Sequence, residues 1–330
     1  MPLPGAVDSV RGVRRRSCAL TASPTTATRF GPADIALLLV LASMWGLSFL
    51  FIEVALPVVA PLWIVATRVT IGAAVLLLIV AIRRVALARD LRMWGHLALL
   101  GVMNNAVPWT AVAYAQRSLP SGLTALLMAM VPMSTLIVSV IVGLERITPL
   151  RLIGLLVSLS GVALIVVGDV DDLGRLLAVS VVLSATVLYA SGTVYAKRKV
   201  SGELSPLALA TGQVLSTAVL LIPVALLLEP LPDLGELTPT IVGSLSALGA
   251  LGTGIAFLVF YSLIERVGAT NATMVTYLVP VVAVIAGVVI LNERLSPAAL
   301  VGGGVVVLGI YLTQRALPKT PAEAFERAHR

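Results

Sequence analysis

Two stretches of the chain, VPMSTLIVSVIVGLERITPLRLIG (residues 131–154) and VPVVAVIAGVVILNERLSPAALVG (residues 279–302), align without a gap at a spacing of 148 residues. Matches between Val and Ile are common in apolar segments, but this alignment also pairs prolines, glutamates, arginines and glycines. The pairs are Pro132 with Pro280, Glu145 with Glu293, Arg146 with Arg294, Pro149 with Pro297 and Gly154 with Gly302. The sequence therefore predicts a proline-bent helix, a Glu-Arg turn and a following helix, each present twice.

The composition places most of the chain in lipid. Of its 330 residues, 58% are hydrophobic and 12% are charged, and the mean hydropathy is +1.04, whereas soluble domains carry about 25% charged residues. Apolar runs of about 20 residues fit membrane-spanning helices, while barrel strands need only about ten. Ten spans are predicted, at residues 33–55, 61–82, 94–116, 119–142, 149–168, 175–196, 204–228, 239–264, 268–291 and 297–315.

The repeat extends over all ten predicted spans. Further corresponding segments are Pro61-Leu62 with Pro206-Leu207, Arg68 with Gln213, Tyr114 with Tyr261 and, more weakly, Trp45-Gly46-Leu47-Ser48 with Tyr189-Ala190-Ser191-Gly192. Each half has five spans, and because five is odd the halves must cross the bilayer in opposite senses. We therefore expect an all-α integral membrane protein with ten transmembrane helices in two inverted five-helix repeats, an arrangement typical of alternating-access carriers.

The positive charges orient the predicted helices. With the N-terminus in the cytoplasm, 19 of the 23 Lys and Arg residues fall in cytoplasmic segments, in agreement with the positive-inside rule. The expected organisation is a disordered basic cytoplasmic tail (1–32), two repeats (33–168 and 175–315) and a cytoplasmic C-terminal tail (316–330). The first tail lacks the apolar core of a signal peptide. Because no disulfide framework or organelle signal is present and the composition is rich in Ala, Val and Arg, we expect a bacterial inner (plasma) membrane location.

Several classes of site are excluded by the residues present. One cysteine, Cys18, and two histidines, His96 and His329, are too few and too far apart for a metal cluster. No GxxxxGKS or GxxxxGKT run for a nucleotide occurs, and the acids at 169–172 have no second acidic cluster with which to share a metal. The formal net charge of +7 is spread over short loops. We expect no cofactor, no metal, no enzymatic activity and no nucleic-acid partner.

The repeated halves resemble the EamA family of the drug/metabolite transporter superfamily. The motifs that carry the resemblance are LERITP at 144–149, NERLSP at 292–297, Trp45-Gly46 and Thr67-Arg68, and it spans about residues 33–315. The resemblance implies a ten-helix bundle with a central cavity that exports small metabolites, amino acids or toxic compounds. Two positions depart from the first half's pattern, since Tyr189 stands where a Trp is expected and Gln213 stands opposite Arg68.

Polar and aromatic side chains inside the spans are the candidates for substrate binding, because an Arg or an amide within lipid needs a partner, water or a cavity. We interpret Arg68 as an anchor for a substrate carboxylate or as a gate, with Glu53 as its nearest partner by depth. A structural tie or a snorkelling Arg68, and asparagines that only join helices, are the open alternatives. The predicted substrate-binding residues are Trp45, Ser48, Arg68, Asn104, Asn105, Trp109, Tyr189, Gln213, Asn271 and Tyr277.

Three residues are candidates for coupling or gating. Glu53 is an acid within a span and would serve proton coupling. Pro132 and Pro280 each remove a backbone donor and bend a helix, which serves gating or only packing. We predict a secondary transporter in the lipid bilayer that exports a small metabolite, amino acid or drug, with protons and a homodimer as open partners. An uncoupled exchanger or importer, a pore and a membrane sensor are the alternatives.

Overall fold

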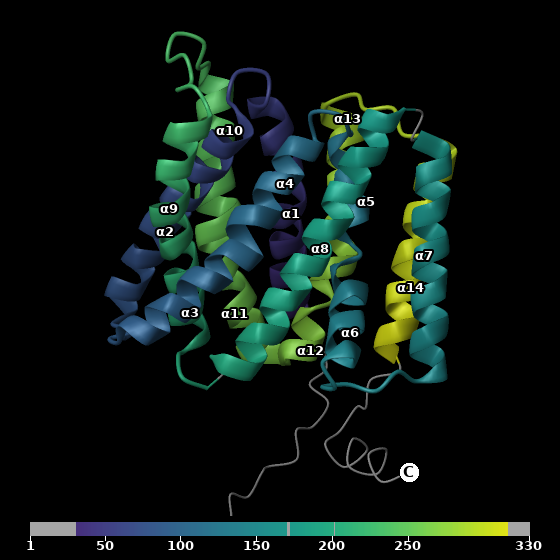
Figure 1. Ribbon diagram of the computed structural model, residues 1–330, viewed down its shortest axis with the longest axis horizontal. Helices are drawn as coiled ribbons and strands as arrows, with labels where there is room; N and C mark the ends of the chain where they lie inside the picture. The colour runs from purple at the N-terminus through teal and green to yellow at the C-terminus, as the bar shows by residue number, and fades with distance from the viewer. Residues whose placement is uncertain (1–30, 170–171, 201, 316–330) are drawn as a thin grey trace, which may run out of the picture.

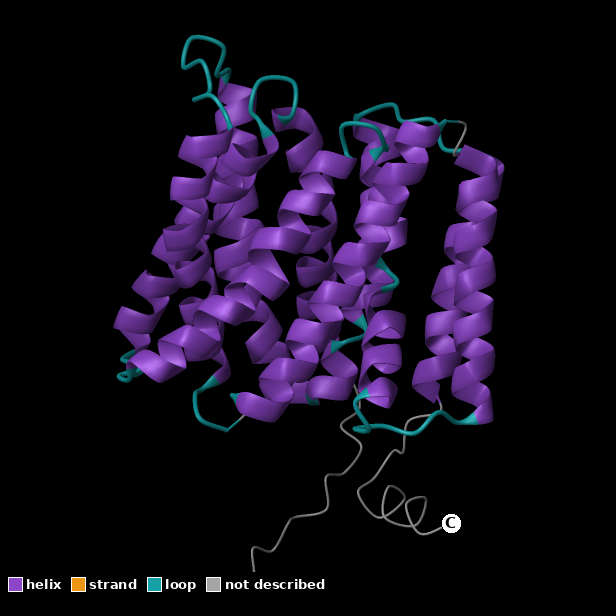
Figure 2. Ribbon diagram, viewed as in Figure 1, coloured by secondary structure: helices purple, strands orange, loops and turns teal. Residues whose placement is uncertain are grey.

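The structure is a computed structural model that describes residues 31–169, 172–200 and 202–315. Every regular element in these residues is a helix, and no strand occurs among them, as Figure 2 shows. The predicted tails, with Cys18 and nearly all of residues 1–32 as well as 316–330, lie outside the described residues. The prediction of an all-α protein is confirmed for the described part of the chain.

The helices fall into two groups along the chain, those before residue 170 and those after residue 171 (Figure 1), which are called the first and the second half. The first half contains α1 (Pro32–Ala55), α2 (Pro61–Arg83), α3 (Leu91–Gly101), the π-helical η1 (Val102–Ala106), α4 (Val107–Ala115), α5 (Ser121–Met128), α6 (Val131–Ile141) and α7 (Pro149–Asp169). The second contains α8 (Leu173–Lys199), α9 (Pro206–Leu228), α10 (Pro239–Gly249), the π-helical η2 (Ala250–Ile255), α11 (Ala256–Val267), α12 (Ala269–Ala272), α13 (Val275–Ile290) and α14 (Pro297–Arg315).

The lengths and hydropathy of these helices identify a multi-span membrane protein. In the part of the chain that the structure describes, eight helical stretches are long and apolar enough to cross a membrane, and Val275–Ile290 is a shorter apolar helix. Their apolar residues point outward as well as inward. Ile82 and Val289, for example, are each 71% exposed, a surface that suits lipid and not water.

Proline and hydroxyl side chains determine where many of the helices begin. A proline occupies the first position of six of them, at residues 32, 61, 149, 206, 239 and 297. Its ring fixes the helical φ, and it lacks an N–H that would have no partner in the first turn. Before two of these helices the side chains of Ser205 and Thr238 accept hydrogen bonds from the backbone N–H groups of Ala208 and Ile241, both at 3.3 Å. These caps reduce the number of unpaired donors at helix ends.

The last helix of each half packs against its counterpart with backbone contact. A Cβ atom added to Gly161 on α7 would lie 2.6 Å from the carbonyl oxygen of Gly302 on α14, and one added to Gly302 would lie 2.6 Å from the carbonyl oxygen of Gly161. Gly154, earlier on α7, faces Thr313, later on α14. Residue numbers thus rise along one helix as they fall along the other, so α7 and α14 run antiparallel, and Figure 1 shows them side by side.

Within the described residues, three clusters of buried apolar residues each combine elements from both halves. One cluster joins α1, α2 and α4 to α9 and α10; a second joins α5 and α7 to α8 and α14; and a third joins α1 to α11, α12 and α13. The two halves therefore share their cores and do not form separate globules.

The predicted third and eighth spans each contain a π-helical segment at the same place in the repeat. Val102, where η1 begins, and Ala250, where η2 begins, are 148 residues apart. Pro108 follows η1 within two residues and cannot donate to the helix. Segments of this kind are frequent at functional sites because they displace side chains from the regular helical register. The sequence reasoning did not anticipate either segment.

The proline positions match the breaks in the helices in one half only. Span four breaks between α5 and α6, and Pro132 lies in the first turn of α6, where its missing N–H is not needed. In span nine the break falls at Thr273 and Met274, whereas Pro280 lies inside the uninterrupted α13. The gating role predicted for Pro132 and Pro280 stays a prediction.

Candidate functional site

Arg68 is the charged side chain at the centre of the candidate site. It lies on α2 and is 7% exposed. Its Nε donates a hydrogen bond to Thr253 Oγ1 at 3.0 Å, and its Nη2 donates to the Gly252 carbonyl oxygen at 3.4 Å. Its guanidinium carbon lies 3.8 Å from the centroid of the Trp109 ring, a cation–π contact. All three contacts are with neutral groups.

Arg68 does not contact Glu53, its candidate partner by depth, in this structure. Gln116 Nε2 donates to Glu53 Oε2 at 3.0 Å and to the Phe49 carbonyl oxygen at 2.9 Å, so Glu53 is held at the α1–α4 contact. Depth along the helices was a poor guide because a side chain's partner depends on which helix faces it. Among the described residues, no carboxylate forms an ion pair with Arg68, and its positive charge is not balanced by the protein there.

In the second half, Gln213 occupies the position that corresponds to Arg68, and its side-chain amide bonds to an amide of the first half. Asn104 Nδ2 donates to Gln213 Oε1 on α9 at 3.1 Å, and Asn105 Nδ2 donates to Thr217 Oγ1 at 3.3 Å. Both asparagines belong to η1. The polar residues of α9 therefore bond to the π segment of the first half, while Arg68 on α2 bonds to the π segment of the second half. The two sets of contacts correspond to each other under the repeat.

One face of α8 connects the two sets of contacts. Tyr189 lies near Arg68. Gly192, three residues later and therefore on the same helix face, leaves the space that the Asn104 side chain occupies, since a Cβ there would overlap Asn104 Oδ1. That oxygen is buried and has no hydrogen-bond partner in the described part of the chain. The site thus combines an unbalanced cation with an unused acceptor.

The remaining predicted residues divide into those near this network and those outside it. Ser48 packs against η2, where a Cβ on Gly252 would lie 2.6 Å from its Oγ. Trp45 packs on Phe260, with ring centroids 5.3 Å apart. Asn271 and Tyr277 do not join the network: Asn271 Nδ2 donates to the Val267 carbonyl oxygen at 2.9 Å, and Tyr277 packs with the apolar cluster of α5, α8 and α14.

Two functional candidates were missed in the sequence, and both are threonines. Thr253 and Thr217 receive the hydrogen bonds of Arg68 and Asn105. Each hydroxyl also donates to its own helix, to the carbonyl oxygens of Leu248 at 3.4 Å and Gln213 at 2.8 Å. Threonines commonly satisfy themselves in this way within helices, so the residue type carries no signal of a second partner.

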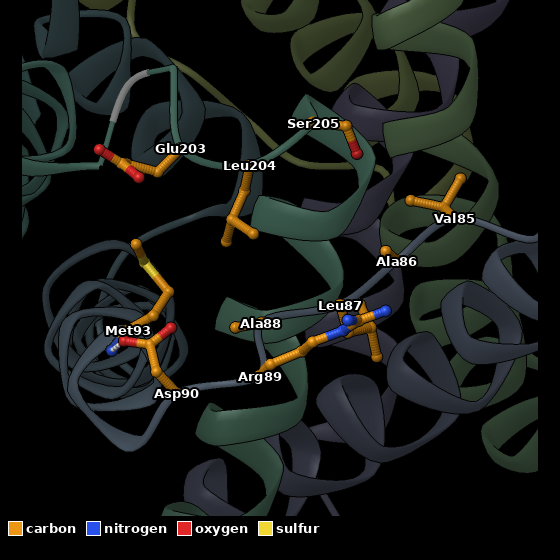
Figure 3. Close-up of a pocket in the computed structure, with 10 residues that line it drawn as sticks. All are labelled: Val85, Ala86, Leu87, Ala88, Arg89, Asp90, Met93, Glu203, Leu204 and Ser205. Atoms are coloured by element: carbon orange, nitrogen blue, oxygen red, sulfur yellow. Dashed lines mark hydrogen bonds between the residues drawn. The ribbon is translucent and has the colours of Figure 1, made fainter.

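Two cavities lie at one end of the helix bundle, away from this network. A cavity of about 470 Å³ opens between the α2–α3 linker and the α8–α9 linker (Figure 3). Its wall includes the charged side chains of Arg89, Asp90 and Glu203, and Asp90 Oδ2 accepts a hydrogen bond from the Met93 N–H at 2.9 Å. A cavity of about 120 Å³ lies beside it. No group of three or more metal-ligating side chains occurs among the described residues.

Replacing Gly192 by alanine is expected to disrupt the site without disrupting the fold. The new methyl group would collide with Asn104 Oδ1 and push the amide away from Gln213. We expect transport to fall about tenfold or more, because one to two buried hydrogen bonds are lost. Gly243→Ala is the matched control, since nothing lies within 4 Å of a Cβ there. Equal transport by both variants would contradict a role for the Asn104–Gln213 contact.

The comparison with known proteins identifies the family. Residues 33–167 and 176–315 match the EamA-like transporter family. The chain is a member of the EamA-like transporter family. The resemblance expected from the sequence is confirmed, and the protein is a membrane transporter of the drug/metabolite transporter type.

Three relatives of this EamA-like transporter are transporters or exporters by name. It is 26% identical to an uncharacterized transporter of Archaeoglobus fulgidus over 83% of this chain and 95% of the relative. It is 28% identical to the uncharacterized inner membrane transporter YedA of Escherichia coli over 82% and 86%. It is 30% identical to a probable terminal-alkyne amino-acid exporter of Streptantibioticus cattleyicolor over 69% and 74%.

A solved crystal structure has the same fold as this transporter. The two superimpose with a TM-score of 0.63 over 87% of this chain and 99% of the other, at 19% sequence identity. At that identity the likeness concerns the fold alone.

Proposed function

We propose that this EamA-like transporter is a secondary carrier that exports small carboxylate-bearing metabolites, amino acids foremost, across a bacterial plasma membrane. The observation that carries the proposal is the buried Arg68, whose described partners are a hydroxyl, a carbonyl and an aromatic ring. A buried charge without a counter-ion is unfavourable. A substrate carboxylate would supply the missing negative charge and would accept the guanidinium donors.

The neighbouring acceptor suits the other end of an amino acid. Asn104 Oδ1 is buried without a partner and borders the same face of α8 as Arg68. A carbonyl-type oxygen accepts hydrogen bonds from an ammonium group without forming an ion pair. The name of the Streptantibioticus relative, a probable amino-acid exporter, agrees with this substrate class.

Alternating access is the transport mechanism that the arrangement of the halves supports. The repeat-related helices α7 and α14 run antiparallel, as inverted five-helix repeats require. Leu91–Ala115 is helical throughout as α3, η1 and α4, and together with α12–α13 it would complete ten crossings beside the eight long spans. We take residues 33–168 and 175–315 as the two repeats. Carriers of this kind expose a site between the repeats to each side in turn.

The proposed orientation follows from the loops. The α2–α3, α6–α7 and α8–α9 linkers lie at the lower end of Figure 1, and Lys and Arg residues gather in and beside them. We place this end, with both termini, in the cytoplasm. The E. coli relative, named an inner membrane transporter, supports the bacterial inner membrane. Glu53 is the proposed proton-coupling residue, and Trp45, Ser48, Asn105, Trp109, Tyr189 and Gln213 are the proposed surroundings of the substrate.

The test is transport by purified protein in liposomes. Labelled phenylalanine should leave loaded vesicles saturably, and unlabelled phenylalanine on the far side should accelerate it, while phenethylamine, which lacks the carboxylate, should not compete. An inside-to-outside pH gradient that changes the rate would establish proton coupling, whereas an unchanged rate would favour the uncoupled exchanger. Flux that never saturates would indicate a pore, and efficient transport of phenethylamine would overturn the carboxylate proposal.

A further inference from the structure

The carboxylate of Glu293 joins the α13–α14 linker to the start of α5 in the other half. Its Oε1 accepts a hydrogen bond from the Ser121 N–H at 2.7 Å, and its Oε2 accepts one from the Gly122 N–H at 3.0 Å. These N–H groups have no partner within the helix, and the helix dipole gives them a partial positive charge. The contact therefore combines two charge-assisted hydrogen bonds in one side chain.

Gly287 on α13 leaves the space that the Glu293 carboxylate occupies. A Cβ atom on Gly287 would overlap the Glu293 carboxylate and would lie 3.1 Å from Ser121 Oγ. The Glu293 N–H also donates to the Gly287 carbonyl oxygen at 3.0 Å, which holds the linker against the end of α13. Any larger side chain at residue 287 would displace the carboxylate from α5.

Glu145, the repeat-related residue of Glu293, has the same backbone contact but a different carboxylate partner. Its N–H donates to the Ser139 carbonyl oxygen at 3.2 Å, and Ser139 is 148 residues before Gly287. Its Oε2, however, accepts from Arg151 Nη1 at 3.0 Å, within its own half. The residues that correspond to Ser121 and Gly122 are 269–270, at the start of α12. The two equivalent carboxylates are thus in two different states.

The packing of spans four and nine shows the same difference between the two ends. At the upper end of Figure 1, α13 packs along α5, and the Glu293 linker crosses above them. At the lower end, no extended contact joins α6 to α12 in the described part of the chain. The two spans are therefore held together at the end where Glu293 is bonded and not at the end where Glu145 lies.

A second carboxylate shows the same asymmetry. At the upper end Glu229 accepts hydrogen bonds from the Leu62 N–H at 2.9 Å and from Tyr114 Oη at 2.5 Å. The repeat-related place at the lower end, beside Leu207 and Tyr261, is instead the cavity of about 120 Å³. At this second place a carboxylate joins the halves at the upper end, and a cavity lies at the corresponding place at the lower end. The lower end also has a carboxylate contact of its own, since Arg266 Nε donates to Asp34 Oδ1 at 2.6 Å.

We propose that Glu293 is a latch that holds the upper end of the transporter closed by bonding to the start of α5, and that Glu145 is its counterpart for the lower end. In the state seen here the Glu293 latch is engaged and the Glu145 latch is released onto Arg151. In the opposite state Glu145 bonds near residues 269–270 and Glu293 is released. The proposal rests on the alternating-access function above and names the residues that control which end is open.

The experiment measures the exposure of two single cysteines in lipid nanodiscs, where a maleimide reagent reaches both faces. In a Cys18→Ser background, Ser121→Cys reports on the upper end and Ser262→Cys reports on the lower cavity. Ser121 is 0% exposed, and its Oγ has no hydrogen-bond partner among the described residues, so cysteine fits there with little loss. Ser262 lines the cavity and should react readily.

Glu293→Gln should raise the labelling rate at residue 121 by about tenfold or more and lower it at residue 262, because the amide loses the charge that strengthens both hydrogen bonds. Adding Glu145→Gln to this variant should bring both rates back toward the original values, since the opposite state then loses its latch too. Glu236→Gln removes the same charge from the α9–α10 linker at the same end and should change neither rate. Gly287→Ala displaces the Glu293 carboxylate without altering its charge, and it should change the two labelling rates in the same directions as Glu293→Gln. It replaces Glu293→Gln in the experiment if that variant does not accumulate in the membrane.

Three results would overturn the latch. The first is unchanged labelling rates in both Glu293→Gln and Gly287→Ala, and the second is a labelling rate that rises at both residues 121 and 262 in Glu293→Gln. The third is a double variant whose labelling rates equal those of Glu293→Gln. The assay needs no substrate, so it separates this proposal from the transport function. Suppose that excess phenylalanine changes the labelling rates at residues 121 and 262 in opposite directions, while Glu293→Gln changes neither rate. The protein is then a carrier, but Glu293 is not its latch. A protein that moves phenylalanine as an unsaturable leak fails as a carrier, whatever Glu293→Gln does to the labelling rates.

Discussion

Arg68→Gln is expected to reduce phenylalanine transport by about 100-fold or more, because two charge-assisted hydrogen bonds to a buried carboxylate contribute about 3 kcal/mol or more together. Arg68→Lys should recover little of the loss, since an ammonium lacks the planar fork that bonds a carboxylate and stacks on Trp109. Initial rates of counter-flow in liposomes measure both effects.

The glutamine variant is designed to keep the fold intact. Gln213 holds the position of Arg68 in the other half and is accommodated there by a neutral hydrogen bond. Arg92→Gln removes the same charge from an exposed position at the start of α3 and should transport normally. Arg68→Gln protein that accumulates in the membrane and transports phenylalanine at more than half the normal rate would show that Arg68 serves the packing of α2 only.

Gly302→Ala is expected to lower the stability of the transporter by about 1–3 kcal/mol, the usual effect of overpacking a tight contact. The new methyl group would meet the Gly161 carbonyl oxygen at 2.6 Å, and backbone cannot move aside as a flexible side chain does. The helices α7 and α14 would have to separate. Thermal unfolding of the purified protein in detergent, followed by the loss of the monodisperse peak on size exclusion, measures the change.

Gly304→Ala is the matched control, two residues along the same helix. Nothing lies within 4 Å of a Cβ at Gly304, and alanine is favoured over glycine in a helix by about 0.5–1 kcal/mol. This variant should unfold at the same temperature as the unmodified protein or at a higher one. Similar destabilisation by both substitutions would mean that the backbone contact of α7 and α14 does not hold the pair together.

The sequence was informative wherever a residue is poorly suited to lipid. Arg68, Asn104, Asn105 and Gln213 stand out because a charge or an amide in a span needs a partner, and all four belong to the polar network of the structure. Helix starts were also predictable where proline occupies the first turn, as at Pro149. The matched Glu-Arg turns indicated the repeat itself.

The partners of these residues could not be predicted from the sequence. Arg68 and Thr253 are 185 residues apart in the sequence. Their contact depends on how α2 packs against η2, and the pattern of residues within one span does not show which other span it will face. The π segments shift the register of spans three and eight, so a regular helix would place Asn104 and Thr253 incorrectly. Asn271 and Tyr277 lie outside this network, with a local backbone acceptor for Asn271 and an apolar cluster around Tyr277, and their role in substrate binding stays a prediction.

The bond between Arg68 and Thr253 also has a consequence for how the protein is made. A ribosome adds about 5–20 residues per second, so the 185 residues that separate the two positions take roughly 10–40 s to synthesise. During that interval the guanidinium of the nascent first half lacks the two acceptors that it has in the folded protein, Thr253 Oγ1 and the Gly252 carbonyl oxygen. The hydrogen bonds of Arg68 in the folded protein can therefore form only after η2 has been synthesised.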